Sequence, residues 1–86
     1  MRVGQVITAE QIRAGRAAIG WSAEQLSNAA GIVRRTLVAI ESQSGVPSAN
    51  ARTLQQLQSA LESAGIEFVG TPSDGPGIRI RTGSRD

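Results

Sequence analysis

GWSAEQLSNAAGIVRRTLVAIE, residues 20–41, is the stretch that decides the fold of this chain. Ser22 followed three residues later by Gln25 is a capping-box pattern, which predicts a helix from Ala23 to Ala30. Gly31 permits the left-handed backbone conformation in which such a helix ends and the chain turns sharply. A second helix is then expected from about Arg34 to Ser42. The stretch therefore predicts two short helices joined at Gly31, and the second opens with two adjacent arginines.

The segments on either side predict two further helices. Thr8 and Gln11 repeat the capping-box pattern, which predicts a helix from about Ala9 to Ile19 that ends at Gly20. A fourth helix is expected to begin after a cap at Ser48 or Asn50 and to end near Ala64. Its apolar stripe has the spacing of one helix face and consists of Leu54, Leu57 and Leu61.

The last part of the chain changes from a helical to an alternating pattern. Residues 66–69 and 78–81 alternate apolar and polar side chains, and residues 71–77 between them are rich in turn formers. This pattern predicts a β-hairpin with a loose loop. Because an isolated two-stranded hairpin is only marginally stable, we expect it to pack on the helices or to pair with another chain. The candidate dimer interface consists of Ile66, Phe68, Ile78 and Ile80.

Length and composition limit what else the chain can be. With 86 residues, we expect residues 1–65 to form one small domain, residues 66–81 to form its hairpin extension, and residues 82–86 to be a disordered tail. The absence of cysteine and histidine excludes disulfides, thiolate or imidazole metal sites and the usual general base. No paired acids or glycine-rich phosphate loop suggest catalysis, so neither an enzyme nor a cofactor or metal is expected. The sequence has no apolar run that could span a membrane and no signal peptide, so we expect a cytoplasmic protein.

The charge of the chain is carried by arginine. All nine basic residues are arginines, and seven acids leave a net charge of +2, which does not by itself indicate a polyanionic partner. The position of the arginines is more informative than their sum, because Arg34 and Arg35 stand at the start of a predicted helix. An adjacent pair of arginines on a surface helix is as often simply solvated as bound to a ligand. Where two adjacent arginines begin the second of two helices joined by a sharp turn, they favour contact with DNA.

From Ile12 to Leu61, about 50 residues, the chain resembles the XRE family of helix-turn-helix proteins, which are of the phage-repressor and Cro type. The matching residues are Arg16, Gly20-Trp21-Ser22, Glu24, Leu26, Ala30-Gly31, Thr36-Leu37, Ile40-Glu41, Pro47-Ser48 and Leu54. The resemblance implies a mainly α protein, a four-helix lambda-repressor-like domain that here carries a C-terminal β-hairpin. It also implies that the second helix braces across the DNA backbone while the third lies in the major groove.

The resemblance assigns roles to individual residues. It places Val33 and Arg34 at the end of the recognition helix that faces the groove, with Arg35, Thr36 and Ala39 as further contacts. It also implies a structural salt bridge between Arg16 and Glu41. Side-chain chemistry adds a phosphate contact at the Ser22 cap and an apolar contact with thymine methyl groups at Val38. It also adds contacts with the DNA backbone at Gln43 and Arg52. The candidate DNA-binding residues are Ser22, Val33, Arg34, Arg35, Thr36, Val38, Ala39, Gln43 and Arg52.

The chain departs from the family at several of these positions. Ala23, Val33 and Ala39 stand where the family commonly has side chains that form hydrogen bonds, and the hairpin replaces a fifth helix. The expected function is a sequence-specific DNA-binding transcriptional regulator, a repressor that binds a palindromic operator as a homodimer. One alternative is an antitoxin or other partner-neutralising protein that also binds DNA, with a toxin or co-regulator as the protein partner. The other is a helical dimer module without DNA binding, which the three departures favour.

Overall fold

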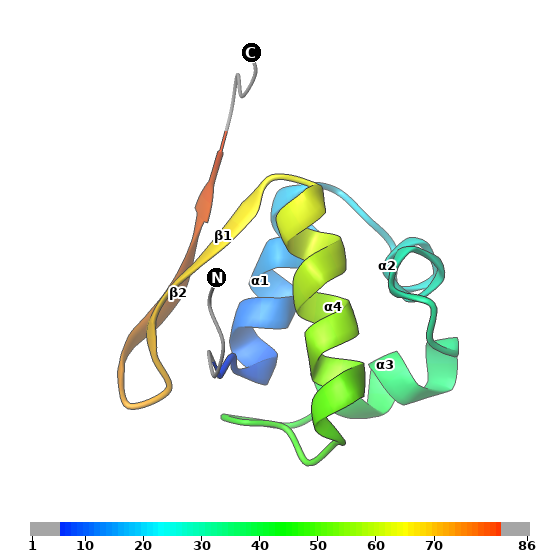
Figure 1. Ribbon diagram of the computed structural model, residues 1–86, viewed down its shortest axis with the longest axis horizontal. Coiled ribbons are helices and arrows are strands. Elements are labelled where there is room, and N and C mark those ends of the chain that lie inside the picture. Colours follow the sequence, from blue (N-terminus) through cyan, green and yellow to red (C-terminus); the bar gives the residue numbers. More distant parts are fainter. Residues whose placement is uncertain (1–5, 82–86) are drawn as a thin grey trace.

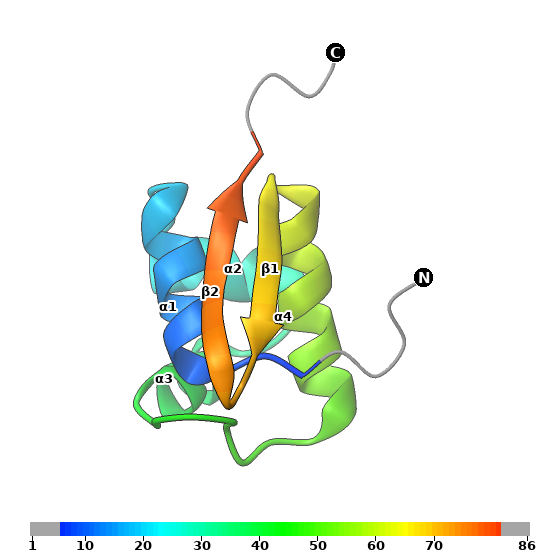
Figure 2. The same ribbon diagram turned by 90° about the vertical axis from the view of Figure 1, so that its left-hand side faces the viewer.

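The computed structural model describes residues 6–81 of the chain. The elements are α1 (Ala9–Ala18), α2 (Ala23–Ala30), α3 (Arg34–Glu41), α4 (Ala51–Ser63), β1 (Ile66–Thr71) and β2 (Asp74–Ile80). The hairpin lies on one side of α1 and α4, and α2 and α3 lie on the other side (Figures 1 and 2). The prediction of a mainly α protein with four helices and a C-terminal β-hairpin is confirmed. The tail expected to be disordered, residues 82–86, lies outside the described residues.

The helices begin where the capping residues predict. Thr8 and Ser22 each form a complete capping box, with Gln11 and Gln25 respectively. Asn50, rather than Ser48, caps α4, because its side-chain oxygen accepts a hydrogen bond from the N–H of Thr53 at 2.8 Å. The expected ends of α1, α3 and α4 each ran one residue too far, since Ile19, Ser42 and Ala64 are the C-caps and not the last helical residues.

Apolar side chains from every helix, from β1 and from the segment before α1 form one core. Its buried members are Ile7, Ile12, Leu26, Ala30, Leu37, Ile40, Leu57, Leu61, Ile66 and Phe68. Gly15 on α1 is part of this packing, because a Cβ there would lie 3.3 Å from Cγ2 of Ile66. The absence of a side chain at Gly15 thus lets β1 approach α1 closely. The core includes side chains from both residues 1–65 and the hairpin, so the hairpin is part of the same folded domain.

The hairpin is tighter than the turn-rich sequence suggests. Ile66 pairs with Ile80 and Phe68 with Ile78 in an antiparallel register, and the strands extend to Thr71 and Asp74. The expectation of a loose loop over residues 71–77 was therefore wrong. The reason is an irregularity in the pairing between Val69 and Thr71, where Gly70 adopts a φ of 77°. A Cβ at Gly70 would lie 2.2 Å from the carbonyl oxygen of Gly75, so only glycine allows the strands to close here.

The chain's own core covers half of the residues expected at a dimer interface. Ile66 is 1% exposed and Phe68 is 3% exposed within a single chain. Assigning these two residues to an interface was therefore wrong, because they pack inward in the monomer. Ile78 is half-buried against the core, and Ile80 remains 51% exposed at the end of β2. Of the four candidates, Ile80 is thus the one that offers substantial apolar surface to a second chain.

A single buried glutamine joins α1 to the hairpin. The side-chain amide of Gln11 donates to the carbonyl oxygens of Val69, at 3.0 Å, and Gly77, at 2.8 Å. Its oxygen accepts from the N–H of Thr8 at 2.8 Å, which completes the capping box. Val69 and Gly77 face each other across the strands beside the irregularity at Gly70. Gln11 therefore caps α1 and fixes the hairpin at the same time, and only the first of these roles was predicted.

Replacing Gln11 with alanine is expected to lower the free energy of unfolding by about 2–3 kcal/mol. Four side-chain hydrogen bonds are lost, two buried and two partly buried, and two carbonyl oxygens lose a donor. Gln25→Ala is the matched control, since Gln25 occupies the equivalent capping-box position on α2 but is exposed and bonds only within its box. Urea unfolding of both variants gives the comparison. Equal losses in the two variants would show that the contact between Gln11 and the hairpin contributes nothing to stability.

Candidate nucleic-acid interface

The link between α2 and α3 is a short, hydrogen-bonded turn. Gly31 is the C-cap of α2 with a φ of 74°, and its N–H donates to the carbonyl of Asn28 at 3.2 Å. The N–H of Ile32 donates to the carbonyl of Ser27 at 3.0 Å, and the Ile32 side chain packs against the core. These contacts leave the turn little freedom. They set the direction in which α3 leaves it.

The side chains of α3 divide into a buried and an exposed face. Leu37 and Ile40 are buried in the core, and Thr36 is half-buried. The exposed face has the one-turn spacing of a helix surface and consists of Arg34, Arg35, Val38 and Ala39. Helix α3 lies on the far side of the molecule from the hairpin (Figure 1). The hairpin therefore does not cover the exposed face of α3.

The two arginines on this face have no partner within residues 6–81. Neither Arg34 nor Arg35 forms an ion pair or a side-chain hydrogen bond there. The arginines of α1 and of the hairpin region behave differently, since Arg13, Arg16, Arg79 and Arg81 all contact a carboxylate. Among the described arginines, the side chains that remain available to a ligand are those of Arg34, Arg35 and Arg52.

The N-terminus of α3 is also open. Val33 is its N-cap and forms no side-chain hydrogen bond, whereas Thr8, Ser22 and Asn50 cap the other three described helices. The N–H of Thr36 donates to the Val33 carbonyl at 3.1 Å, so within residues 6–81 the N–H groups without an acceptor at this end are those of Arg34 and Arg35. Such groups, together with the helix dipole, favour an anion. The open end of α3 thus adds hydrogen-bond donors beside the two free guanidinium groups.

Ser22 brings the start of α2 to the same region. Its hydroxyl oxygen accepts from the N–H of Gln25 at 3.0 Å, and its own proton remains free to be donated. A hollow of about 590 Å³ separates the starts of α2 and α3. It is lined by Ser22, Ala23, Glu24, Ser27, Asn28, Ile32, Val33 and Arg34. The structure therefore brings the candidate residues Ser22, Val33 and Arg34 together around one concave surface.

An ion pair holds α3 against α1. Nε of Arg16 donates to Oε2 of Glu41 at 2.8 Å, and Nη2 donates to Oε1 at 2.8 Å. The third nitrogen of Arg16 donates to the carbonyl oxygen of Trp21 at 3.0 Å, just before α2. The hydrogen bonds to the Glu41 carboxylate raise the pKa of Arg16 above its usual value, and burial opposes that shift. The guanidinium group of Arg16 thus ties together α1, the start of α2 and the end of α3.

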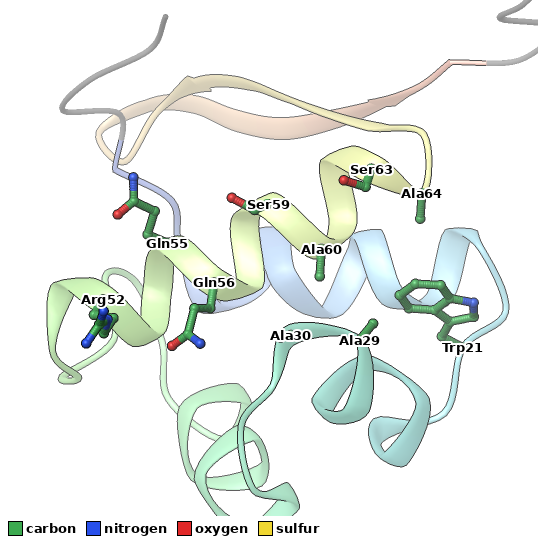
Figure 3. Close-up of a pocket in the computed structure, with 10 residues that line it drawn as sticks. All are labelled: Trp21, Ala29, Ala30, Arg52, Gln55, Gln56, Ser59, Ala60, Ser63 and Ala64. Atoms are coloured by element: carbon green, nitrogen blue, oxygen red, sulfur yellow. The ribbon is translucent and has the colours of Figure 1, made fainter.

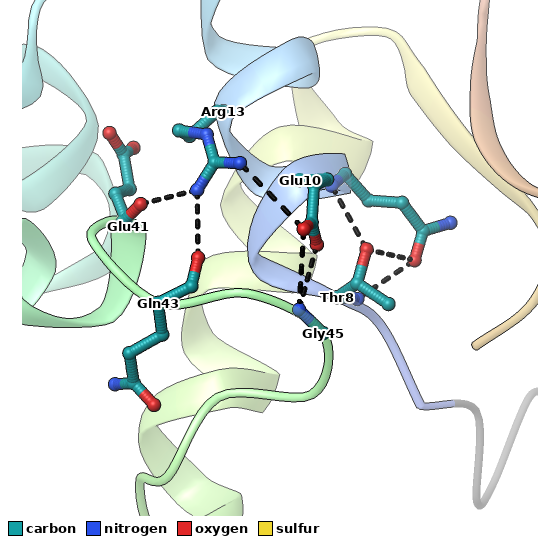
Figure 4. A network of polar contacts seen from close by, with 7 residues as sticks. Thr8, Glu10, Arg13, Glu41, Gln43 and Gly45 are labelled. Carbon is teal, nitrogen blue, oxygen red and sulfur yellow. Dashed lines mark hydrogen bonds and ion pairs between the residues drawn. The ribbon is translucent and has the colours of Figure 1, made fainter. Parts of the chain in front are cut away.

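A second polar network holds the loop that follows α3 (Figure 4). Nη1 of Arg13 donates to the carbonyl oxygens of Glu41 and Gln43, the latter at 3.0 Å. The Glu10 carboxylate accepts from the N–H of Gly45 at 3.0 Å. The pKa of Glu10 lies below its usual value because its own backbone N–H and that of Gly45 stabilise the charged form. Sequence reasoning missed this network, since its partners lie about thirty residues apart.

Gln43 belongs to this loop and not to the free surface of α3. Its side-chain oxygen accepts from the N–H of Ser48 at 2.7 Å, and its side-chain nitrogen donates to the carbonyl of Ala39 at 3.2 Å. Both ends of the amide therefore have a partner within the chain. The DNA contact at Gln43 stays a prediction, because its amide keeps a second N–H proton and a second lone pair beyond these two hydrogen bonds.

Arg52 lies in the first turn of α4, at one end of a groove between α2 and α4 (Figure 3). The groove has a volume of about 610 Å³, and Trp21 lies at its other end. The remaining lining is Ala29, Ala30, Gln55, Gln56, Ser59, Ala60, Ser63 and Ala64. Gln56 also borders the turn at Gly31, because a Cβ on that glycine would lie 3.7 Å from its side-chain nitrogen. The groove thus extends from Trp21 past the turn to a free guanidinium group.

Comparison with known proteins adds no relative: no protein-family model matches the chain, and no curated protein is significantly similar to it. Within residues 6–81, no three acidic side chains are grouped as a metal site would require. None of the helices in that part of the chain is both long enough and apolar enough to cross a membrane.

Proposed function

We propose that this protein is a sequence-specific DNA-binding transcriptional regulator whose α2–turn–α3 unit is a helix-turn-helix of lambda-repressor type. In this proposal α3 lies in the major groove of a duplex. The observation that carries it is the pair Arg34 and Arg35, which are exposed and have no partner within residues 6–81, at the open start of a helix tied to α1 by an ion pair. A guanidinium group can bind O6 and N7 of guanine together in the major groove, which makes this pair suited to reading base edges.

The dimensions of α3 agree with such a role. A helix with its side chains is about 10–12 Å wide, and the major groove is about 12 Å wide. The eight residues of α3 span about 12 Å, which corresponds to three or four base pairs at about 3.4 Å each. One copy therefore reads a short half-site.

The groups around α3 supply the contacts that set its register on the DNA. The Ser22 hydroxyl, the half-buried Thr36 and the free Arg52 are the side chains proposed to bind phosphate oxygens. The uncapped N–H groups of α3 add donors that favour an anion. Contacts of this kind orient a protein on the duplex without reading its sequence.

A short half-site also supports a homodimer. Two copies related by twofold symmetry would read palindromic half-sites about one helical turn apart and so gain affinity and specificity. The exposed Ile80 and the unpaired outer edge of the hairpin are the surfaces proposed to join the two copies. Binding of such a dimer to an operator that overlaps a promoter would repress transcription.

Selection from a pool of random duplexes tests the proposal. We expect one enriched motif with two inverted half-sites whose centres lie about 10 base pairs apart. Binding to that motif should weaken steeply with salt, since each neutralised phosphate releases counterions. Enrichment of no motif, with only weak binding to all duplexes at low salt, would contradict the proposal and favour a helical module that does not read DNA.

A further inference from the structure

Two valines flank the arginines on the exposed surface of α3. Val33 is 66% exposed and directly precedes Arg34, and Val38 is 47% exposed. Val38 lies one helical turn after Arg34 and Arg35, so its side chain is a neighbour of both on the helix surface. The free guanidinium groups are thus bordered by apolar side chains at both ends.

Neither valine side chain belongs to the hydrophobic core. Leu37 and Ile40 provide the core contacts of α3, whereas Val33 and Val38 belong neither to the core nor to the side chains packed against it. Valine is among the poorest N-caps, and a β-branched residue at an exposed helix position is unfavourable for the helix. Valine is therefore an unfavourable choice for the helix at both positions and brings no gain in core packing, which is typical of residues kept for function.

The major groove offers one kind of apolar group that such a side chain can contact. Thymine carries a methyl group at C5, while the other base edges in this groove are mainly hydrogen-bond donors and acceptors. 5-Methylcytosine carries the same group at the same ring position. A valine beside an arginine can therefore recognise a pyrimidine methyl group beside a guanine.

We propose that Val33 and Val38 each read a pyrimidine 5-methyl group that lies next to a guanine bound by Arg34 or Arg35. This inference rests on the proposed function and specifies what the α3 surface recognises. A helical turn rises about 5.4 Å and a base step about 3.4 Å, so the methyl group read by Val38 lies one or two base pairs from that guanine.

The first test uses the selected duplex with each thymine replaced in turn by deoxyuridine, which removes only the methyl group. At each thymine contacted by a valine, within two base pairs of a bound guanine, affinity is expected to fall about fourfold, as for loss of one buried methyl group. The variant V33A/V38A should bind the thymine and deoxyuridine duplexes equally. Val46→Ala is the control, because Val46 is 49% exposed but lies in the loop after α3, and it should retain the fourfold difference.

The second test separates the two sources of the methyl group. At each sensitive position, the T·A pair is replaced by C·G, with the cytosine either plain or methylated at C5. Recovery of affinity on methylation would show that 5-methylcytosine is accepted, and lack of recovery would assign the methyl group to thymine alone.

Tight binding that no deoxyuridine substitution weakens would overturn this inference and leave the proposed function intact. A thymine preference that persists in V33A/V38A would also overturn it, whereas binding to no duplex would refute both.

Discussion

The double variant R34A/R35A is expected to lose at least about 30-fold in affinity for the selected duplex. Each bidentate contact between arginine and guanine contributes about 1–3 kcal/mol of discrimination, so the loss of two corresponds to about 2–6 kcal/mol. Both side chains are exposed and have no partner within residues 6–81, so the fold should not change. Gel-shift titration measures the affinity, and circular dichroism with thermal unfolding verifies that the helices are intact.

The hairpin region offers a matched control for this double variant. R79A/R81A also removes two arginines and lowers the formal net charge from +2 to 0, but from residues that pair with Glu67 on the other side of the molecule. Because these arginines flank Ile80 at the proposed dimer contact, size-exclusion chromatography first verifies that the control still dimerises. It should then lose only the part of the affinity that depends on overall charge. Similar losses in the two double variants would mean that α3 is not the surface that reads DNA.

Breaking the ion pair between Arg16 and Glu41 is expected to cause the largest loss of stability. In Arg16→Ala, the carboxylate of Glu41 loses both of its hydrogen bonds, and its side chain is only 10% exposed. Removing one partner of a buried pair costs about 3–5 kcal/mol. We expect about 3 kcal/mol here, because the Arg16 side chain is 26% exposed and solvent screens part of the interaction. In a domain of this size, such a loss lowers Tm by more than about 10 °C.

Two further variants distinguish the cost of a buried charge without a partner from a general loss of packing. Glu67→Ala removes a carboxylate that pairs with exposed arginines and should cost no more than about 1 kcal/mol. The double variant R16M/E41L should be more stable than Arg16→Met alone, because it leaves no buried charge without a partner. If Arg16→Ala costs no more than Glu67→Ala, the pair does not hold α3 in place.

The candidate surface could be predicted from the sequence as far as it lies on one helix. Arg34, Arg35, Val38 and Ala39 are exposed together because the spacing of Leu37 and Ile40 decides which side of α3 faces the core. Gln43 follows the same helix, but its amide is used by Ser48 in a loop whose path the helical spacing does not specify. The exposure of side chains along one helix therefore followed from its spacing, whereas the hydrogen bonds of Gln43 beyond its end did not.

Local sequence determined where α1, α2 and α4 begin and where α2 ends. The capping oxygens of Thr8, Ser22 and Asn50 meet an N–H only three residues away, and Gly31 needs no distant partner to adopt its turn. The tertiary structure alone decided that the hairpin belongs to the core. Gln11 meets Val69 and Gly77 across 58 and 66 residues of chain. An alternating pattern marks a strand but does not say which surface buries it, because that depends on which neighbours the completed fold brings against the strand.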